Sequence, residues 1–377
     1  MSGGRPELRR AAAHEHRAAL YCIGIDPPKR GSGHVADWHS RSCGRAIYHS
    51  PRRIRLSYKE GLLSHRYRRW RTFCRSHDHD RRDLDATDDP LHGHQEGRFF
   101  HGYYDCYCYL PLYIFCGPHL LAAKQRPANI DAAAGAVEEI ARIVVQIRAR
   151  WPEVRIVLRA DSGFAREALM RWCELNGVDF LFGLAKNQRL IGEIATELAA
   201  AGAESKASGQ PARRFKEFQW ATRDSWSRQR RVVAKAEWTA GAANPRFVVT
   251  SLSAEDAAPQ PLYEEIYCAR GDMENRIKEC QLDLFADRTS AATMRANQLR
   301  LWFASMAYVL LCALRRLALQ PTQFAKATCG TIRLKLLKIG ALVRTSVRRI
   351  TFAMASGCPY QRDFALAHAQ LSNAAAH

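Results

Sequence analysis

The pattern of apolar and polar positions changes at Asp83. Before it, neither a 3.6-residue nor a 2-residue apolar period lasts for more than a few positions. From Asp83 onward the pattern predicts alternating strands and helices, namely a carboxylate-rich strand end at 83–89, strands within 103–116 and at 119–124, an amphipathic helix at 129–151, a strand at 154–160, a helix at 166–176 and a strand at 178–183. In the helix at 129–151, Asp131 is the predicted N-cap, and one face carries Ile140, Ile143, Val144 and Ile147. This order predicts an α/β fold with a mixed sheet and helices on its faces.

The second half of the chain changes character twice. Residues 199–213 are small or polar, and the positions after them predict exposed strands at 216–222 and 230–239 and a buried strand at 247–252. From Leu262 onward the pattern is mostly helical, with helices at 263–284, 291–319 and near 360–368. Leu301–Leu314 is the longest strongly apolar stretch, and it is too short to span a bilayer, so we expect a core helix there. The mixed sheet is therefore expected to be followed by a β-rich insertion and a helical C-terminal part.

Charge and cysteine content narrow the class of protein. The 377-residue chain has a net charge of +20, which favours a polyanionic partner, most commonly nucleic acid, over a merely arginine-rich composition. The 12 cysteines show no metal-ligand spacing, so we expect buried thiols in a reducing cytosol. No apolar segment follows the basic N-terminal residues, so no signal peptide is expected. The sequence thus predicts a soluble cytoplasmic protein with no membrane segment.

Residues 1–82 differ from the rest of the chain in charge. They hold 19 Lys and Arg against 7 Asp and Glu, and eight of the 14 histidines. Three interpretations remain open: a basic nucleic-acid-binding arm, a small folded domain, and translation out of frame with the true frame resuming near Arg82. The abrupt change at Asp83 favours the third interpretation, which predicts a poorly ordered segment and a shortened first strand.

Three separated acidic positions are candidates for metal chemistry. They are the cluster of Asp83, Asp85 and Asp88, then Asp161 at the end of the strand at 154–160, and finally Glu274 within a helix. Carboxylates that meet at strand ends can hold two hard divalent cations, which clamp the attacking and leaving oxygens of a phosphoryl transfer. The alternative for each residue alone is ordinary: an Asp before Ser-Gly caps a turn, and a helical Glu faces solvent. Composition does not choose between these interpretations.

The residues around these carboxylates resemble a known family. The run Leu158-Arg-Ala-Asp-Ser-Gly-Phe164 resembles the second-aspartate motif of insertion-sequence DDE transposases, and 267–274 fits the Tyr-x2-Arg-x3-Glu signature of the insertion-sequence-four-like superfamily. Asp85-Ala-Thr87 fits the Asp-x-Thr of its first strand. More closely, 83–116, 158–190 and 263–300 resemble the thirteen-eighty family of these transposases. The resemblance extends from Asp83 to the C-terminus.

The resemblance implies a fold, a reaction and a metal. It implies a ribonuclease H-like catalytic core whose first part is 83–190, a β-rich insertion at 191–252, and a helical remainder at 253–377. Asp85, Asp161 and Glu274 would hold two Mg²⁺, with Mn²⁺ also supporting DNA cleavage and strand transfer. Asp83 and Asp88 remain open as alternatives to Asp85.

The resemblance also implies DNA contacts. Arg270, one turn before Glu274, would grip a phosphate, and Tyr267 would contact a phosphate or a base. The signature's lysine falls at Gln281, so Lys278 is the candidate replacement. Trp226 is expected either to stack on an unpaired base or to pack within the insertion. A basic run is expected to contact phosphates, namely Arg333, Lys335, Lys338, Arg344, Arg348 and Arg349.

The expected partners are the terminal repeats of the element and its target DNA, bound by a homodimer in the bacterial cytoplasm and nucleoid. The rival interpretation is a non-catalytic DNA-binding protein, including a decayed transposase, because the polar residues before Leu84 predict a shortened first strand. In that case Asp85 would lie at a frayed strand end, poorly placed for metal binding.

Overall fold

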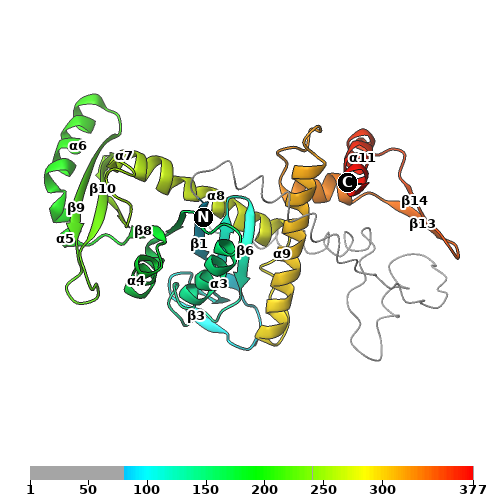
Figure 1. Cartoon of the computed structure of the whole chain (residues 1–377), viewed down its shortest axis with the longest axis horizontal. Coiled ribbons are helices and arrows are strands. Elements are labelled where there is room, and N and C mark those ends of the chain that lie inside the picture. Colours follow the sequence, from blue (N-terminus) through cyan, green and yellow to red (C-terminus); the bar gives the residue numbers. More distant parts are fainter. Residues whose placement is uncertain (1–79, 240, 377) are drawn as a thin grey trace. The chain divides into compact units, whose positions relative to one another are not determined.

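The computed structural model describes residues 80–239 and 241–376 (Figure 1). These residues belong to two compact units, one containing 80–334 and 359–376 and the other containing 335–358. The prediction of a poorly ordered segment at 1–82 falls, as far as residue 79, outside the described residues. Within the described ranges, no helix is both long enough and apolar enough to cross a membrane.

The elements of the larger unit alternate as the pattern predicts. Its first part contains β1 (Asp80–Ala86), β2 (Asp89–Pro90), β3 (Phe99–His101), β4 (Cys106–Tyr109), β5 (Leu112–Cys116), β6 (His119–Lys124), α3 (Ala136–Arg148), β7 (Ile156–Ala160), η3 (Ser162–Phe164), α4 (Glu167–Leu175) and β8 (Asp179–Leu184). Next come α5 (Gln188–Glu193), α6 (Ala195–Ser208), β9 (Ala212–Trp220), β10 (Arg230–Thr239), β11 (Ala242–Ala243) and β12 (Arg246–Thr250).

The remainder is mostly helical. A helical run with local changes of pitch contains α7 (Pro259–Pro261), η4 (Leu262–Tyr267), η5 (Cys268–Arg270), α8 (Gly271–Lys278) and η6 (Glu279–Asp283). It is followed by α9 (Met294–Leu317), α10 (Cys329–Ile332), η7 (Arg333–Leu337) and α11 (Gln361–Ala376). The smaller unit contributes a hairpin of β13 (Ala341–Thr345) and β14 (Ile350–Met354).

One mixed sheet organises the larger unit. Its strand order is β11-β10-β12-β8-β7-β1-β5-β6, and β9 pairs with β10. β1 is parallel to β7, and β7 to β8, whereas β1 and β5, like β5 and β6, are antiparallel. This arrangement of the five strands β6-β5-β1-β7-β8 is that of a ribonuclease H-like sheet, so the predicted fold class is confirmed.

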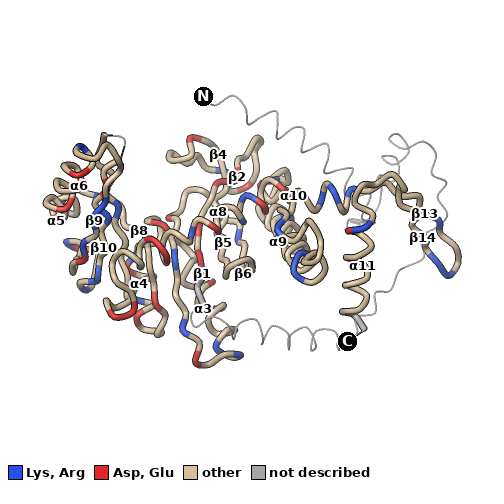
Figure 2. Tube along the Cα trace, turned by 90° about the horizontal axis from the view of Figure 1, so that it is seen from above, with Lys and Arg blue, Asp and Glu red and all other residues tan. Residues whose placement is uncertain are grey.

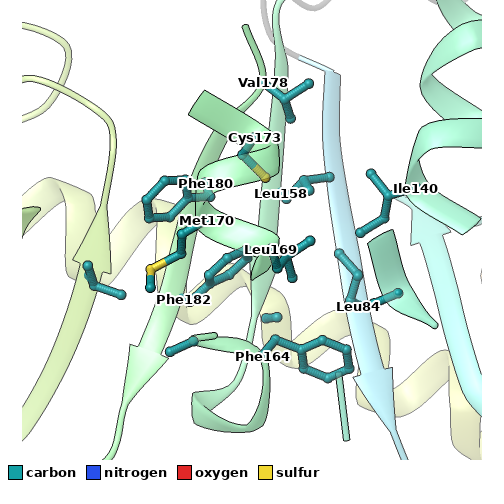
Figure 3. Close-up of a cluster of buried hydrophobic side chains, with 14 of the residues drawn as sticks. Leu84, Ile140, Leu158, Phe164, Leu169, Met170, Cys173, Val178, Phe180 and Phe182 are labelled. Carbon is teal, nitrogen blue, oxygen red and sulfur yellow. The ribbon is translucent and has the colours of Figure 1, made fainter. Parts of the chain in front are cut away.

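Helices cover both faces of this sheet. On one face, Leu84, Leu158 and Phe182 pack with Ile140 of α3 and Leu169 of α4 in a single buried cluster (Figure 3). On the other face, a second buried cluster joins strand residues to η4, namely Val157, Leu181, Val233, Val248, Leu252, Leu262 and Tyr263. The helical run that contains the Tyr-x2-Arg-x3-Glu signature is therefore held against the strands.

The first strand is not cut short. β1 begins at Asp80 and pairs on both sides, with β7 through 80–84 and with β5 through 83–86. The expectation that Asp85 lies at a frayed strand end is therefore wrong. Backbone pairing holds these residues despite their polar side chains, because both neighbouring strands are strongly apolar. The observation on which a decayed catalytic core rested is thereby removed.

Two local predictions about helices are wrong in detail. The helix predicted at 129–151 spans only Ala136–Arg148, and it begins after Gly135, whose φ is +73°. Asp131 is not its N-cap; its carboxylate instead accepts a hydrogen bond from the Ala133 amide in the turn before the helix. The predicted apolar face of Ile140, Ile143, Val144 and Ile147 is buried, as expected.

The predicted β-rich insertion is partly helical and continues the main sheet. The small-residue segment predicted at 199–213 lies largely in α6, where alanines with a high helix propensity form a helix that lacks a clear apolar stripe. β10, predicted to be exposed, is largely buried because it lies between β9 and β12. Its arginines are neutralised: Arg231 pairs with Glu217, and Arg230 with Glu167 and Glu174.

Two predictions for the C-terminal part also need correction. Leu301–Leu314 lies within α9 as expected, but only one side of this helix is buried. The hairpin of β13 and β14 interrupts the helical region, and all ten of its strand residues are exposed. Arg333 does not belong to the exposed basic run, because it is buried with its guanidinium 4.9 Å from the ring centre of Phe285.

A buried ion pair ties the helical run to the centre of the sheet. The Arg159 Nε and Nη2 of β7 donate to the two carboxylate oxygens of Asp83 of β1, at 2.7 and 2.8 Å. The remaining Nη1 of Arg159 donates to the carbonyl oxygen of Ile266 in η4. Both side chains are less than a tenth exposed, so neither has water as an alternative partner. This pair therefore sets where η4 meets the sheet.

We expect Arg159→Met to lower the free energy of unfolding by about 3 kcal/mol, because it leaves the buried Asp83 carboxylate without this ion pair. Urea unfolding monitored by circular dichroism measures the change. Arg166→Met is the matched control, since Arg166 pairs with Asp131 where both side chains are 47% exposed, and its loss should cost less than about 1 kcal/mol. Equal losses in the two variants would contradict a structural role for the buried pair.

Candidate functional site

Two of the predicted carboxylates lie at the same edge of the sheet. β1 and β7 are parallel neighbours, and Leu84 pairs with Ala160, so Asp85 and Asp161 follow side by side. Asp161 comes directly after β7, and its side chain accepts a hydrogen bond from the Gly163 amide at 2.9 Å, which caps η3. Asp161 therefore caps η3 and also lies beside Asp85.

Arg270 brings the third carboxylate to this edge. Its guanidinium donates to Asp85 Oδ2 and to Glu274 Oε1, each at 3.2 Å. Arg270 and Glu274 are one turn apart on the helical run, so one face of that run presents both residues. Glu274 is half exposed, whereas Asp85 is 15% exposed. Asp85, Arg270 and Glu274 thus form a single charged group at the ends of β1 and β7.

Burial dominates the electrostatics of Asp85 in this group. It raises the pKa of Asp85 from 3.8 to about 7, and repulsion from Asp161 and Glu274 adds to the rise. Arg270 opposes the rise by stabilising the carboxylate form. The guanidinium therefore offsets only part of the effect of burial, and a further positive charge beside Asp85 would lower its pKa.

Tyr267 lies beside Arg270 and close to the sheet. The charge of Arg270 lowers the pKa of the Tyr267 hydroxyl, but burial raises it overall. A Cβ atom on Gly183 of β8 would lie 2.6 Å from the Tyr267 oxygen and 2.9 Å from the Ser162 amide nitrogen. Only glycine permits this close approach, so Gly183 is a residue of the site that sequence reasoning missed.

The alternatives to Asp85 within the first acidic cluster have other surroundings. Both carboxylate oxygens of Asp83 accept hydrogen bonds from Arg159. Asp88 follows β1, and its carbonyl oxygen accepts a hydrogen bond from Gln281. Asp85 is therefore the member of the cluster that meets both Arg270 and the charges of Asp161 and Glu274.

The other predicted DNA-binding residues are Lys278 and Trp226. Lys278 is exposed one turn after Glu274. Trp226, in the loop between β9 and β10, is partly buried against the main core cluster and lies 5.5 Å from the Arg230 guanidinium. These contacts favour packing within the insertion over base stacking, and the DNA-binding role of both residues stays a prediction.

Gln281 faces inward rather than toward a ligand. Its amide nitrogen donates to Asp89 Oδ1 and to the Asp88 carbonyl, both at 3.0 Å. Asp89 is fully buried and also accepts a hydrogen bond from Gln125, at 3.2 Å. At the position of the signature's lysine, this chain therefore has a residue that joins the helical run to the loop after β1.

The metal-binding arrangement itself is incomplete as the side chains stand. Among the described residues, no three His, Cys, Asp or Glu side chains are placed so that they would hold a metal ion together. The Arg270 guanidinium contacts the oxygens of both Asp85 and Glu274. The carboxylates are therefore linked by an arginine in this structure.

Comparisons with known proteins place the chain. Residues 65–376 match the family model described as "Transposase DDE domain group 1". This match begins upstream of Asp83, so the change of pattern there is not the start of the family region.

No curated protein matches the chain. Among solved structures, it is similar to a cryo-EM structure of a piggyBac transposase synaptic complex with hairpin DNA, with 9% identity and a TM-score of 0.40. The similar region covers 68% of this chain and 51% of that one, so this chain spans about half of its length.

The buried carboxyl of Asp89 should make stability depend on pH. Burial raises the pKa of Asp89 from 3.8 to about 7, so the folded protein keeps a proton that the unfolded chain has lost above pH 4. Stability is therefore lost progressively as the pH rises from about 4 to 7. Asp89→Asn mimics the protonated form, and the Gln125 amide can turn to accept its hydrogen bond.

Relative to the wild type, we expect Asp89→Asn to gain about 2 kcal/mol of unfolding free energy between pH 5 and pH 8. Urea unfolding at both pH values measures this gain. Asp256→Asn is the control, because hydrogen bonds from Arg155 hold the pKa of Asp256 well below its usual range, and its effect should be constant over this interval. A pH-independent effect of Asp89→Asn would refute the assignment of a proton to Asp89.

Proposed function

This chain belongs to the family described as Transposase DDE domain group 1, and we propose that it catalyses metal-dependent cleavage and strand transfer of DNA. The proposal rests on Arg270, which contacts Asp85 and Glu274, and on Asp161, which follows β7 beside Asp85. More finely, we propose an insertion-sequence transposase of the thirteen-eighty family, as the motifs around these residues suggest. Its substrates would be the terminal repeats of the element and a target DNA, within the bacterial cytoplasm and nucleoid.

The donor set suits hard divalent cations. All three side chains are carboxylates, which Mg²⁺ and Mn²⁺ prefer as ligands. Burial raises the pKa of Asp85 although Arg270 is in contact with it, and a bound cation would lower that pKa again. Two such ions, held by Asp85, Asp161 and Glu274, would supply Lewis-acid stabilisation of the attacking and leaving oxygens.

The remaining residues have roles in holding DNA. Arg270 has the fork geometry for bidentate contact with a phosphate, and its hydrogen bonds to Asp85 and Glu274 orient the guanidinium. Lys278 extends the same helical run toward solvent and is a candidate phosphate contact. Arg344, Arg348 and Arg349 of the hairpin of β13 and β14 are exposed. Figure 2 marks Lys and Arg positions along the chain in blue, including this hairpin. We propose that this hairpin adds sequence-independent affinity for the DNA backbone.

A non-catalytic DNA-binding protein is the second candidate function. The high positive charge supports it as well as it supports an enzyme. The cluster of Asp85, Asp161 and Glu274 favours the enzyme over the non-catalytic protein. Acidic residues beside a bound phosphate oppose DNA binding unless cations accompany them. The two functions therefore predict different effects of removing the carboxylates: an enzyme loses DNA cleavage, whereas a non-catalytic protein has no cleavage to lose.

We expect Asp161→Ala and Glu274→Ala each to reduce cleavage of element-end DNA at least about 100-fold in Mg²⁺, with little loss of DNA binding. A gel assay of strand cleavage and a mobility-shift assay on the same DNA measure the two properties. Asp272→Ala, which removes an exposed carboxylate from the same helix, is the control and should cleave normally. Near-normal cleavage by either test variant would show that these carboxylates are not catalytic.

Arg270 and a divalent cation would compete for the same oxygens of Asp85 and Glu274. We therefore expect Arg270→Gln to bind Mn²⁺ at least about fivefold more tightly than the wild type in the absence of DNA. Electron paramagnetic resonance of free Mn²⁺ measures the dissociation constant without any requirement for activity. Arg276→Gln, in α8 of the same helical run, should leave the Mn²⁺ dissociation constant unchanged. Unchanged or weaker Mn²⁺ binding by Arg270→Gln would rule out the competition.

A further inference from the structure

Two cysteine thiols meet at a single arginine where α9 and α10 are in contact. Cys312 lies in α9, and Cys329 is the first residue of α10. The Arg315 Nη2 atom lies 4.0 Å from Cys312 Sγ and 3.4 Å from Cys329 Sγ. Both sulfurs therefore contact one nitrogen atom, although the segment between α9 and α10 separates the two cysteines in sequence. We call Cys312 and Cys329 the thiol pair.

A carboxylate holds the Arg315 guanidinium beside the thiol pair. Arg315 Nη2 donates to Glu279 Oε2 at 3.0 Å, and the same oxygen accepts a hydrogen bond from the Cys329 amide at 3.3 Å. Glu279 belongs to η6, so η6, α9 and α10 meet at this point. The positive charge is thus fixed next to the sulfurs by a contact in which the sulfurs take no part.

The two thiols differ in exposure and in acidity. Cys312 is partly exposed, whereas Cys329 is fully buried. The neighbouring Cys329 thiol is the largest cause that lowers the pKa of Cys312 to about 7. Tyr308 and Arg315 also lower this pKa, whereas burial and the charge of Glu279 oppose them. The thiolate is the nucleophilic form of cysteine, so Cys312 is the thiol that reacts first.

We propose that Cys312 and Cys329 form a peroxide-reactive thiol pair, which closes to a disulfide between α9 and α10. The Cys312 thiolate attacks hydrogen peroxide, so that an S–O bond forms, the O–O bond breaks, and the leaving hydroxide is protonated to water. The Cys329 sulfur then attacks the Cys312 sulfur, so that the S–S bond forms, the S–O bond breaks, and the departing hydroxide takes the Cys329 proton. Two electrons pass from the sulfurs to the peroxide, and two water molecules form.

The test uses the reduced full-length chain, which is treated with hydrogen peroxide, alkylated, and digested with trypsin without reductant. Trypsin separates Cys312, in 301–315, from Cys329, in 327–333. We expect mass spectrometry to find these two peptides joined, with two hydrogen atoms fewer than the separate peptides, and dithiothreitol to part them again. Cys329→Ala should instead leave Cys312 as a sulfenic acid, which dimedone captures.

Two matched controls come from neighbouring residues. Cys280→Ala removes another buried thiol near Cys312, one whose pKa burial raises, and it should leave the joined peptides unchanged. Arg315→Gln should slow the loss of the Cys312 thiol to peroxide at least about fivefold, because the positive charge beside the thiolate is removed. Arg316→Gln, which changes the exposed arginine next to it, should leave that rate unchanged.

A wild type whose Cys312 can still be alkylated after peroxide treatment would overturn the proposal. A lasting sulfenic acid at Cys312 in the wild type, or a peptide in which Cys312 is joined to Cys280, would also overturn it. These measurements follow thiols and not DNA cleavage, so they decide the proposal whether or not the proposed catalytic function holds.

Discussion

The candidate site depends on the ion pair between Arg159 and Asp83. The strands of the sheet fix Asp85 and Asp161, but Arg270, Tyr267 and Glu274 belong to a helical run that is remote in sequence from them. Arg159 bridges the two by binding Asp83 with two nitrogens and the Ile266 carbonyl with the third. Ile266 directly precedes Tyr267, so the ion pair sets where Tyr267, Arg270 and Glu274 lie along the strands. Burying this charged pair costs desolvation free energy. In return, the pair holds η4 at a defined position against the sheet.

The negative charges of Asp83 and Asp85, two residues apart on β1, are compensated to different extents. Asp83 is matched by Arg159, which binds both of its carboxylate oxygens. Two residues later, Asp85 shares Arg270 with Glu274 and is also close to Asp161, so its negative charge is only partly compensated. The same residue type thus serves architecture in one position and candidate chemistry in the other, and the difference arises from how many carboxylates share one guanidinium.

Sequence reasoning succeeded where information was local. The apolar face of α3, the strand β6 and the order of strands and helices follow from periodicity. The three acidic motifs were chosen by their flanking residues, and their catalytic role stays a prediction. It failed where partners are distant. α6 has too few large apolar residues to show a helical stripe, and the burial of β10 depends on Glu167, Glu174 and Glu217 neutralising its arginines. Arg159 was not recognised, because a positive charge in a buried strand has meaning only beside Asp83, on another strand.

The continuous ladder from β8 through β12 to β10 limits how this protein can be shortened. β12 pairs with β8 along four residues, so the strands of the 191–252 segment complete an edge of the core sheet. Deletion of that segment would leave Phe180 and Phe182 beside an edge of unpaired amide and carbonyl groups. Such an edge invites pairing with another chain and aggregation. A minimal, soluble version of this core would need a replacement strand along β8, and not simply a shorter loop after it.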